Sequence, residues 1–126
     1  MGYPIEYEGI IYPSTEYAYQ AAKTLDINKR REIQNCRTPG DAKRTGRNIT
    51  IRQDWEEIKY IVMLHLVTEK FKHPLLKSWL NNTGTAELVE FNTWHDQIWG
   101  VCTCPKCGGI GENLLGKILM RVRSEL

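Results

Sequence analysis

The chain has no apolar run that approaches the roughly 18 residues of a membrane span. Its densest apolar stretch, residues 61–67, is short and is interrupted by His65. The first six residues, Met1 to Glu6, contain neither the basic segment nor the apolar segment that opens a secretory signal. The sequence therefore argues against membrane insertion and secretion. We expect a cytoplasmic protein without a membrane partner.

Cysteine is scarce and unevenly placed. Four cysteines occur in 126 residues, and three of them, Cys102, Cys104 and Cys107, lie close together near the end. Such crowding is typical of reduced thiols rather than of a disulfide framework spread over the chain. A chain of this length buries roughly two-thirds of its unfolded surface, so it needs neither disulfides nor a metal to fold.

Neither sign of charge dominates the chain, because its net charge is only +2. Hydrophobic residues make up 41% and charged residues 25%, which is typical of a globular protein and argues against disorder. Residues 29–52, however, contain eight basic residues and two acidic ones, a net of +6, which leaves −4 for the rest. Such an excess attracts phosphates or nucleic acid, although solvated helices with charged outer faces explain it equally well.

The sequence contains no repeat or low-complexity tract, so we expect one domain over residues 1–126. The pattern of apolar and capping residues predicts an α+β fold that is predominantly α-helical with a small β element. The expected elements are a hairpin over 5–12, helices over 16–23, 28–35, 39–46, 54–71, 74–81 and 113–123, and a strand over 87–91. The expected apolar stripe of the longest helix contains Trp55, Ile58, Ile61, Val62, Leu66 and Phe71.

An acid and a base share one face of the first predicted helix. Glu16 and Lys23 are seven residues apart, which at about 100° per residue places them within about 20° of the same direction. Such a pair is usually a solvated surface pattern. On a half-buried face, desolvation and mutual attraction would instead tune both groups for acid–base or iminium chemistry.

The segment from Trp94 to Gly100 is unusually rich in side chains that carry chemistry. Trp99 is suited to stack on a base, and Asp96 to polarise a water or a sugar hydroxyl. The alternative is that both tryptophans are core anchors and Asp96 caps a turn, and for Trp94 we expect the core. We do not expect His95 to be catalytic.

A glycine-rich turn and a cysteine cluster precede the last predicted helix. Gly108, Gly109 and Gly111 would leave backbone N–H groups available to a phosphate, but they match neither a Walker A loop nor a dinucleotide-binding fingerprint. By themselves they predict a turn before a helix. Cys104-Pro-Lys-Cys107 is half of a zinc knuckle and Cys102 offers a third ligand, so the fourth would have to be Cys36 or His95. We favour reduced cysteines and assign no metal ligand.

Taken in order, these segments resemble the NADAR (NAD and ADP-ribose) superfamily, also called YbiA-like. The matching segments include Tyr12 to Lys23, Thr38 to Lys43 with Gly46-Arg47, Arg52-x-Asp54-Trp55, Asp96-x2-Trp99-Gly100 and Gly111-x-Asn113-x-Leu115-Gly116. Each is weak alone, but the ordered set is specific and spans nearly the whole chain.

The resemblance implies an N-glycosidase. It implies either removal of ADP-ribose from guanine in nucleic acid or nucleotides, which we favour, or cleavage of phosphoribosylamino-pyrimidine intermediates of riboflavin synthesis. By resemblance, Glu16 is the general acid/base, Asp96 stabilises charge or orients water, and Lys23 binds substrate or attacks the anomeric carbon. Substrate contacts are implied for Tyr19, Arg52, Trp55, Trp99, Gly111 and Asn113. We expect no cofactor, and ADP-ribosylated DNA or RNA is the expected macromolecular partner.

The sequence departs from the family pattern at its start. Members usually carry a Phe-x-Ser-Asn-Phe motif ahead of the segment that matches residues 4–9, and only three residues precede that segment here. We expect the consequence to fall on substrate affinity rather than on catalysis. Two other classes of function stay open: a non-catalytic binder of ADP-ribose or NAD, and a zinc-stabilised interaction or nucleic-acid module.

Overall fold

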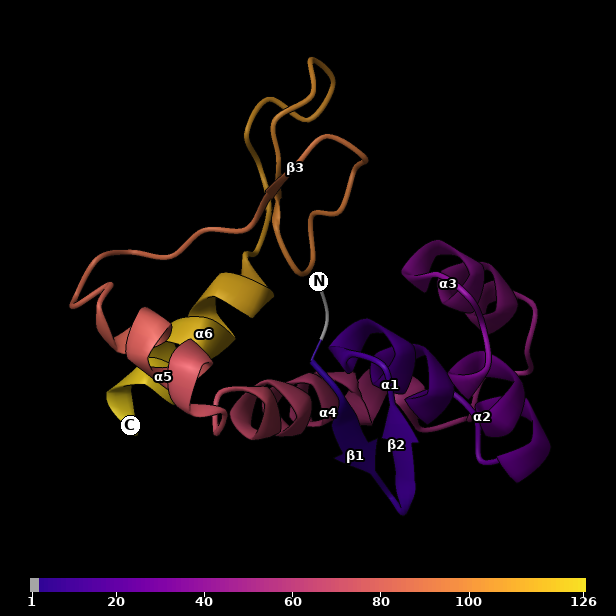
Figure 1. Ribbon diagram of the computed structural model, residues 1–126. Helices are drawn as coiled ribbons and strands as arrows, with labels where there is room; N and C mark the ends of the chain where they lie inside the picture. Colours follow the sequence, from indigo (N-terminus) through magenta and orange to yellow (C-terminus); the bar gives the residue numbers. More distant parts are fainter. Residues whose placement is uncertain (1–2) are drawn as a thin grey trace. The chain divides into compact units, whose positions relative to one another are not determined.

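The computed structural model describes residues 3–126, so the expectations for Met1 and Gly2 lie outside the described residues. The chain divides into two compact units, Met1–Lys70 and Phe71–Leu126. Helices predominate over short strands in the described residues, which confirms the α+β, mainly helical class (Figure 1). Between residues 3 and 126, no helix is both long enough and apolar enough to cross a membrane.

The first unit opens with the predicted hairpin. Strands β1 (Ile5–Tyr7) and β2 (Ile10–Tyr12) pair antiparallel. The turn residues Glu8 and Gly9 have φ of 47° and 86°, the left-handed conformation that a two-residue hairpin turn requires. The first and last residue of each strand are buried and the middle residues are exposed, so the alternation in the sequence sets the face that packs inward.

Four helices complete this unit: α1 (Thr15–Ala22), α2 (Ile27–Gln34), α3 (Pro39–Arg47) and α4 (Trp55–Lys70). Their ends lie within one residue of the predicted ones. The Asp26 carboxylate accepts hydrogen bonds from two N–H groups at the start of α2, and Thr38 Oγ1 accepts one at the start of α3. Ser14 occupies the N-cap position of α1 as predicted, but its side chain makes no capping bond.

Helix α1 lies at the centre of the first unit and packs against the hairpin and the other three helices (Figure 1). Its alanines, Ala18, Ala21 and Ala22, are fully buried and let the neighbouring elements approach closely. The predicted stripe of α4 is right for Trp55, Val62 and Leu66 and wrong for Ile61, which is 64% exposed. Ile61 precedes Val62 by one position and therefore points about 100° away from it.

The second unit contains α5 (Pro74–Asn81), β3 (Phe91–Asn92), β4 (Val101–Cys102) and α6 (Leu114–Ser124). The two strands form a short parallel pair. The predicted strand over 87–91 is wrong in extent, because only Phe91 belongs to a strand. The backbone just before Phe91 instead pairs with the side chain of Asn113, which donates to the Leu88 carbonyl and accepts from the Glu90 N–H.

The core of the second unit is small. Its buried apolar residues are Phe71, Leu80, Cys102, Ile118 and Val122. The expectation that Trp94 is a core anchor is wrong, since its side chain is 63% exposed. Trp94 lies on the loop between β3 and β4, beyond the two residues of β3 that pair with β4.

Candidate functional site

Three of the predicted site residues meet around the Tyr19 ring in the first unit. The ring packs edge-on against Trp55, with 5.1 Å between ring centroids. Lys23 Nζ lies 5.7 Å from the centroid of the same ring. Lys23, the C-cap residue of α1, follows Tyr19 by four positions and so lies on the same side of the helix, where Trp55, the first residue of α4, packs against the Tyr19 ring.

Arg52 is anchored beside this group. Its backbone N–H donates to the Lys23 carbonyl at 2.7 Å. Its guanidinium donates two hydrogen bonds to the Asp54 carboxylate, at 2.6 and 3.1 Å. This pairing raises the pKa of Arg52 and lowers that of Asp54, so both stay charged.

Lys23 sits in an environment that disfavours its charged form. Burial is the main cause that lowers the pKa of its ammonium group, and the positive charges of Lys43 and Arg47 lower it further. Within residues 3–70, no carboxylate forms an ion pair with Lys23. A partly desolvated lysine without a counter-charge is suited either to bind a phosphate or to react as an amine.

Glu16 lies in the first turn of α1 and is exposed. Its Oε1 accepts a hydrogen bond from Thr15 Oγ1 at 3.1 Å. The helix N-terminus favours a negative charge at this position. The Thr15 hydroxyl therefore holds the carboxylate while it remains accessible to a substrate.

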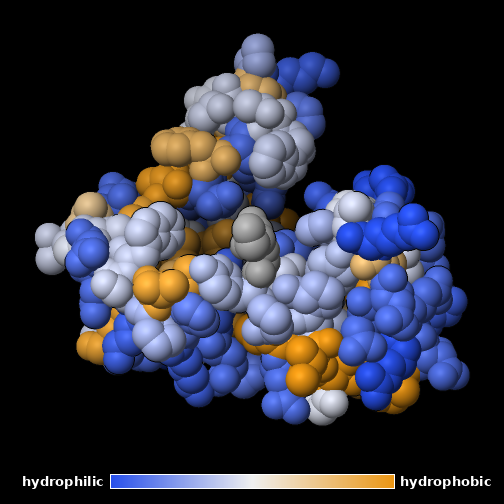
Figure 2. All heavy atoms as spheres, viewed as in Figure 1, coloured by the Kyte–Doolittle hydropathy of each residue, from blue (hydrophilic) through white to orange (hydrophobic). Residues whose placement is uncertain are grey.

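The basic segment mostly faces solvent, where Figure 2 shows hydrophilic residues over α2 and α3. Six of its eight basic residues are exposed: Lys29, Arg31, Arg37, Lys43, Arg44 and Arg47. Arg30 is different, because its buried guanidinium donates to the Thr24 carbonyl and to Glu8 Oε1. Arg30 therefore stabilises the fold and does not belong to a ligand-attracting surface.

In the second unit, the carboxylate of Asp96 is held in one orientation. Its Oδ1 accepts hydrogen bonds from the backbone N–H groups of Ile98 and Trp99, at 3.1 and 2.9 Å. The side-chain amide of buried Asn92 binds the backbone of Asp96 on both sides. It accepts from the Asp96 N–H and donates to the Asp96 carbonyl. The turn-capping role considered for Asp96 is thus confirmed, and it leaves Oδ2 without a hydrogen bond among residues 71–126.

The loop that carries Trp99 is joined to the start of α6. The Trp99 carbonyl accepts from the Leu115 N–H at 2.9 Å, and the Gly100 carbonyl accepts from the Asn113 N–H. A Cβ on Gly111 would overlap the Gly100 carbonyl, so only glycine fits there. Asn113 is buried, and both ends of its amide bind backbone groups. The substrate contacts expected for these residues stay predictions.

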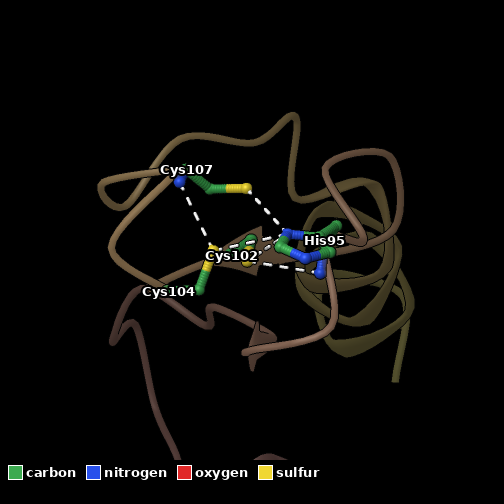
Figure 3. A group of neighbouring side chains, drawn as sticks. All are labelled: His95, Cys102, Cys104 and Cys107. Atoms are coloured by element: carbon green, nitrogen blue, oxygen red, sulfur yellow. Dashed lines mark hydrogen bonds between the residues drawn. The ribbon is translucent and has the colours of Figure 1, made fainter.

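A cluster that the sequence did not assign joins His95, on the same loop, to Cys102 of β4 and to Cys104 and Cys107 of the turn that follows (Figure 3). Nδ1 of His95 lies 3.3 Å from Sγ of Cys104 and 3.3 Å from Sγ of Cys107. It lies 4.0 Å from Sγ of Cys102. Of the two candidates for a fourth partner, the structure therefore selects His95. Cys36 instead belongs to the first unit, with its Sγ 3.6 Å from Thr45 Oγ1.

The three thiols of this cluster do not titrate alike. Burial raises the pKa of Cys102, but a hydrogen bond from the Cys104 N–H and bonds from the neighbouring thiols outweigh it and bring the pKa to about 7. The hydrogen bond to Cys102, together with burial, raises the pKa of Cys107 to about 11. The cluster thus holds one thiolate close to neutral pH.

The predicted site residues fall into two groups. The first unit carries Glu16, Tyr19, Lys23, Arg52 and Trp55, and the second carries Asp96, Trp99, Gly111 and Asn113. That both groups act in one reaction stays a prediction.

The chain is similar in sequence and in structure to known proteins. An N-glycosidase YbiA of Shigella boydii is 38% identical over 127 residues, covering 98% of this chain and 76% of that protein. A riboflavin biosynthesis protein of Vibrio vulnificus is 36% identical over 125 residues, covering 97% of this chain and 33% of that protein. The NMR structure of Escherichia coli YbiA superimposes with a TM-score of 0.82 at 36% identity, covering 98% of this chain and 73% of that one. The model of the NADAR domain matches residues 1–126, and the chain belongs to this family.

Proposed function

We propose that this protein is an N-glycosidase that removes ADP-ribose from guanine bases in nucleic acid or nucleotides. The name that the YbiA relatives carry supports cleavage of an N-glycosidic bond. The choice of a phosphate-bearing substrate is supported by the side chains around Lys23.

A single observation carries the proposal: a half-buried lysine, Lys23, lies beside an aromatic pair and forms no ion pair with a carboxylate of residues 3–70. Lys43 and Arg47 add positive charge near Lys23, and a diphosphate would supply the missing negative charge. Tyr19 and Trp55 offer ring surfaces next to this charge, suited to a sugar or a base. An ADP-ribosyl group combines both kinds of partner.

The chemistry assigns different tasks to the two carboxylates. Breaking the bond between the anomeric carbon and the base nitrogen places positive charge on the sugar and an electron pair on the nitrogen. As the general acid/base, Glu16 delivers a proton to that nitrogen, while the fixed carboxylate of Asp96 stabilises the sugar cation until water adds to it. Glu16 then recovers its proton from the added water.

Lys23 offers a covalent variant of this reaction. Its neutral amine attacks the anomeric carbon, the base leaves with the bonding pair, and opening of the sugar ring gives an iminium ion. Water hydrolyses the iminium and regenerates the amine. The lowered pKa of Lys23 favours this route because it raises the fraction of neutral amine at a given pH.

The decisive test is Glu16→Gln, which removes the proton donor and keeps the size of the side chain. We expect the rate of ADP-ribose release from ADP-ribosylated DNA to fall about 10²- to 10⁴-fold with an unchanged melting temperature. Glu57→Gln, at an exposed position of α4 in the same unit, is the matched control and should retain the rate. Undiminished release by Glu16→Gln would refute the role of Glu16.

A second candidate function is cleavage of a phosphoribosylamino-pyrimidine, which the riboflavin biosynthesis relatives favour. Parallel incubation with both substrates, with the released fragments identified by mass, separates the two. Cleavage of the phosphoribosylamino-pyrimidine alone would identify this compound, and not ADP-ribosylated guanine, as the substrate. Saturable binding of ADP-ribose without any product would instead identify a non-catalytic binder.

A further inference from the structure

The loop between β3 and β4 and the turn that follows β4 bring four metal-binding side chains together. We propose that His95, Cys102, Cys104 and Cys107 form a structural zinc site. One ligand atom from each lies within 4.8 Å of all the others (Figure 3). The proposal concerns this cluster alone and does not depend on the glycosidase activity.

The local backbone is built as a metal-binding turn. The Cys107 and Gly108 N–H groups donate to the Cys104 carbonyl, which makes a tight turn between the two cysteines. The Cys107 N–H also reaches Cys104 Sγ at 3.4 Å, and the His95 N–H reaches Cys102 Sγ at 3.3 Å. Backbone donors aimed at sulfur stabilise the thiolate form that a metal needs.

His95 adopts a conformation that supports the same conclusion. Its φ is 68°, in the left-handed region that few residues other than glycine adopt. This conformation aims the imidazole at the three sulfurs, which lie 3.3 to 4.0 Å from Nδ1. Backbone strain of this kind persists where the surrounding structure gains from it.

The distances and the donor set fit Zn²⁺. Bonds of about 2.3 Å to sulfur and about 2.0 Å to nitrogen at tetrahedral angles give ligand-to-ligand distances of roughly 3.5 to 3.8 Å. The observed distances bracket these values, so small side-chain shifts suffice. Three thiolates and one imidazole fill all four positions, which is the closed arrangement of structural sites.

The second unit would gain stability from such a site. Few of its apolar side chains are buried, and a small core leaves little stabilisation for the long loops around β3 and β4. A metal that binds only the folded chain raises the free energy of unfolding by its free energy of binding. His95 is adjacent to Asp96, so the ion would also fix the loop that orients this carboxylate.

Metal analysis of the intact purified protein tests the site. With reducing agent and no chelator during purification, we expect about one zinc and no iron per chain by plasma mass spectrometry. Cys104→Ser should lose most of this zinc, whereas Cys36→Ser, outside the cluster, should keep it. Absence of zinc from the wild-type protein, or its full retention by Cys104→Ser, would overturn the proposal.

Cobalt substitution keeps the proposal testable where Cys104→Ser fails to fold. After zinc is removed with a chelator, titration of the wild-type protein with Co²⁺ should give one equivalent with thiolate-to-cobalt charge transfer and intense tetrahedral bands. Added Zn²⁺ should abolish these bands, because it binds cysteine-rich sites more tightly. A weak octahedral spectrum would contradict a closed three-cysteine, one-histidine site. Iron in place of zinc in the metal analysis would overturn the assignment to zinc.

Discussion

At the scale of single residues, the surroundings of Lys23 disfavour the charged form of its side chain. It is half-buried against Tyr19, has no carboxylate partner within residues 3–70, and lies in the positive field of Lys43 and Arg47. A residue that mattered only for folding would be better replaced by an uncharged one. The arrangement makes sense if a substrate supplies the negative charge.

Lys23→Met should expose this trade between stability and function. The pKa of Lys23 is lower in the folded than in the unfolded chain, because the fold disfavours the charged amine. The resulting loss in the free energy of unfolding is therefore complete at pH values below the folded pKa. It disappears as the pH rises toward 10.5, the ordinary lysine value. We therefore expect Lys23→Met to melt higher than wild type at pH 7, with a difference that shrinks toward pH 10.5.

The same variant should lose activity. If Lys23 binds the phosphates or reacts as an amine, turnover should fall about 10²-fold or more. Borohydride should trap a substrate adduct on the wild-type protein if the covalent route operates, and none on Lys23→Met. Lys77→Met, at an exposed lysine of α5, serves as control for both measurements. A variant with normal turnover would exclude Lys23 from the reaction.

At the scale of elements, the start of α6 organises the candidate loop of the second unit. N–H groups of its first residues bind the carbonyls of Ile98 and Trp99, and Asn113 binds Leu88 and Glu90. Gly116 permits this packing, because a Cβ there would overlap the Leu88 carbonyl and the Asn113 amide. The loop geometry is therefore set by a helix rather than by the short strands.

Replacing glycine by alanine in two helices tests this reading. Gly116→Ala should destabilise the protein by about 1–3 kcal/mol, since the backbone carbonyl it meets cannot move aside. At Gly40, in α3, an added Cβ would make only an ordinary contact with Thr38 Oγ1, at 3.8 Å, so Gly40→Ala should stabilise the protein by about 0.4–1 kcal/mol. Urea unfolding measures both changes. Equal effects of the two substitutions would show that the contact at Gly116 is not restrictive.

At the scale of the whole molecule, the charge is segregated along the chain. Residues 29–52 carry a net +6, while the protein as a whole carries only +2. Most of these basic side chains are exposed, so they attract a polyanion over a wider area than a single phosphate needs. A nucleic-acid substrate should therefore depend on this segment more than a free nucleotide does.

Salt and substitution should reveal this difference. We expect the KM for ADP-ribosylated DNA to rise steeply with salt, and the KM for an ADP-ribosylated guanine nucleotide to rise little. Lys43→Gln should reduce the slope of log KM against log salt by about one for the DNA substrate. Lys117→Gln, an exposed lysine outside the segment, should leave the slope unchanged. Identical salt dependence for both substrates would argue against nucleic acid as the substrate.

How much the sequence predicts follows from the range of the interactions involved. The sequence predicts helix ends within one residue because capping residues such as Asp26 and Thr38 act on N–H groups a few positions away. The hairpin followed from alternation around Glu8-Gly9 for the same reason. The strand over 87–91 was overextended because its partner is a side chain more than twenty residues away.

The sequence by itself determined the helices, the hairpin, the family and the residue types that carry the chemistry, since these depend on short spacings and ordered motifs. Only the tertiary structure showed that Arg30 is buried, that Lys23 lies against Tyr19 near other cations, and that Trp94 is exposed. Only the tertiary structure chose His95 over Cys36 as the neighbour of the clustered cysteines. Burial and long-range contacts depend on how distant segments pack, and no local pattern encodes that packing.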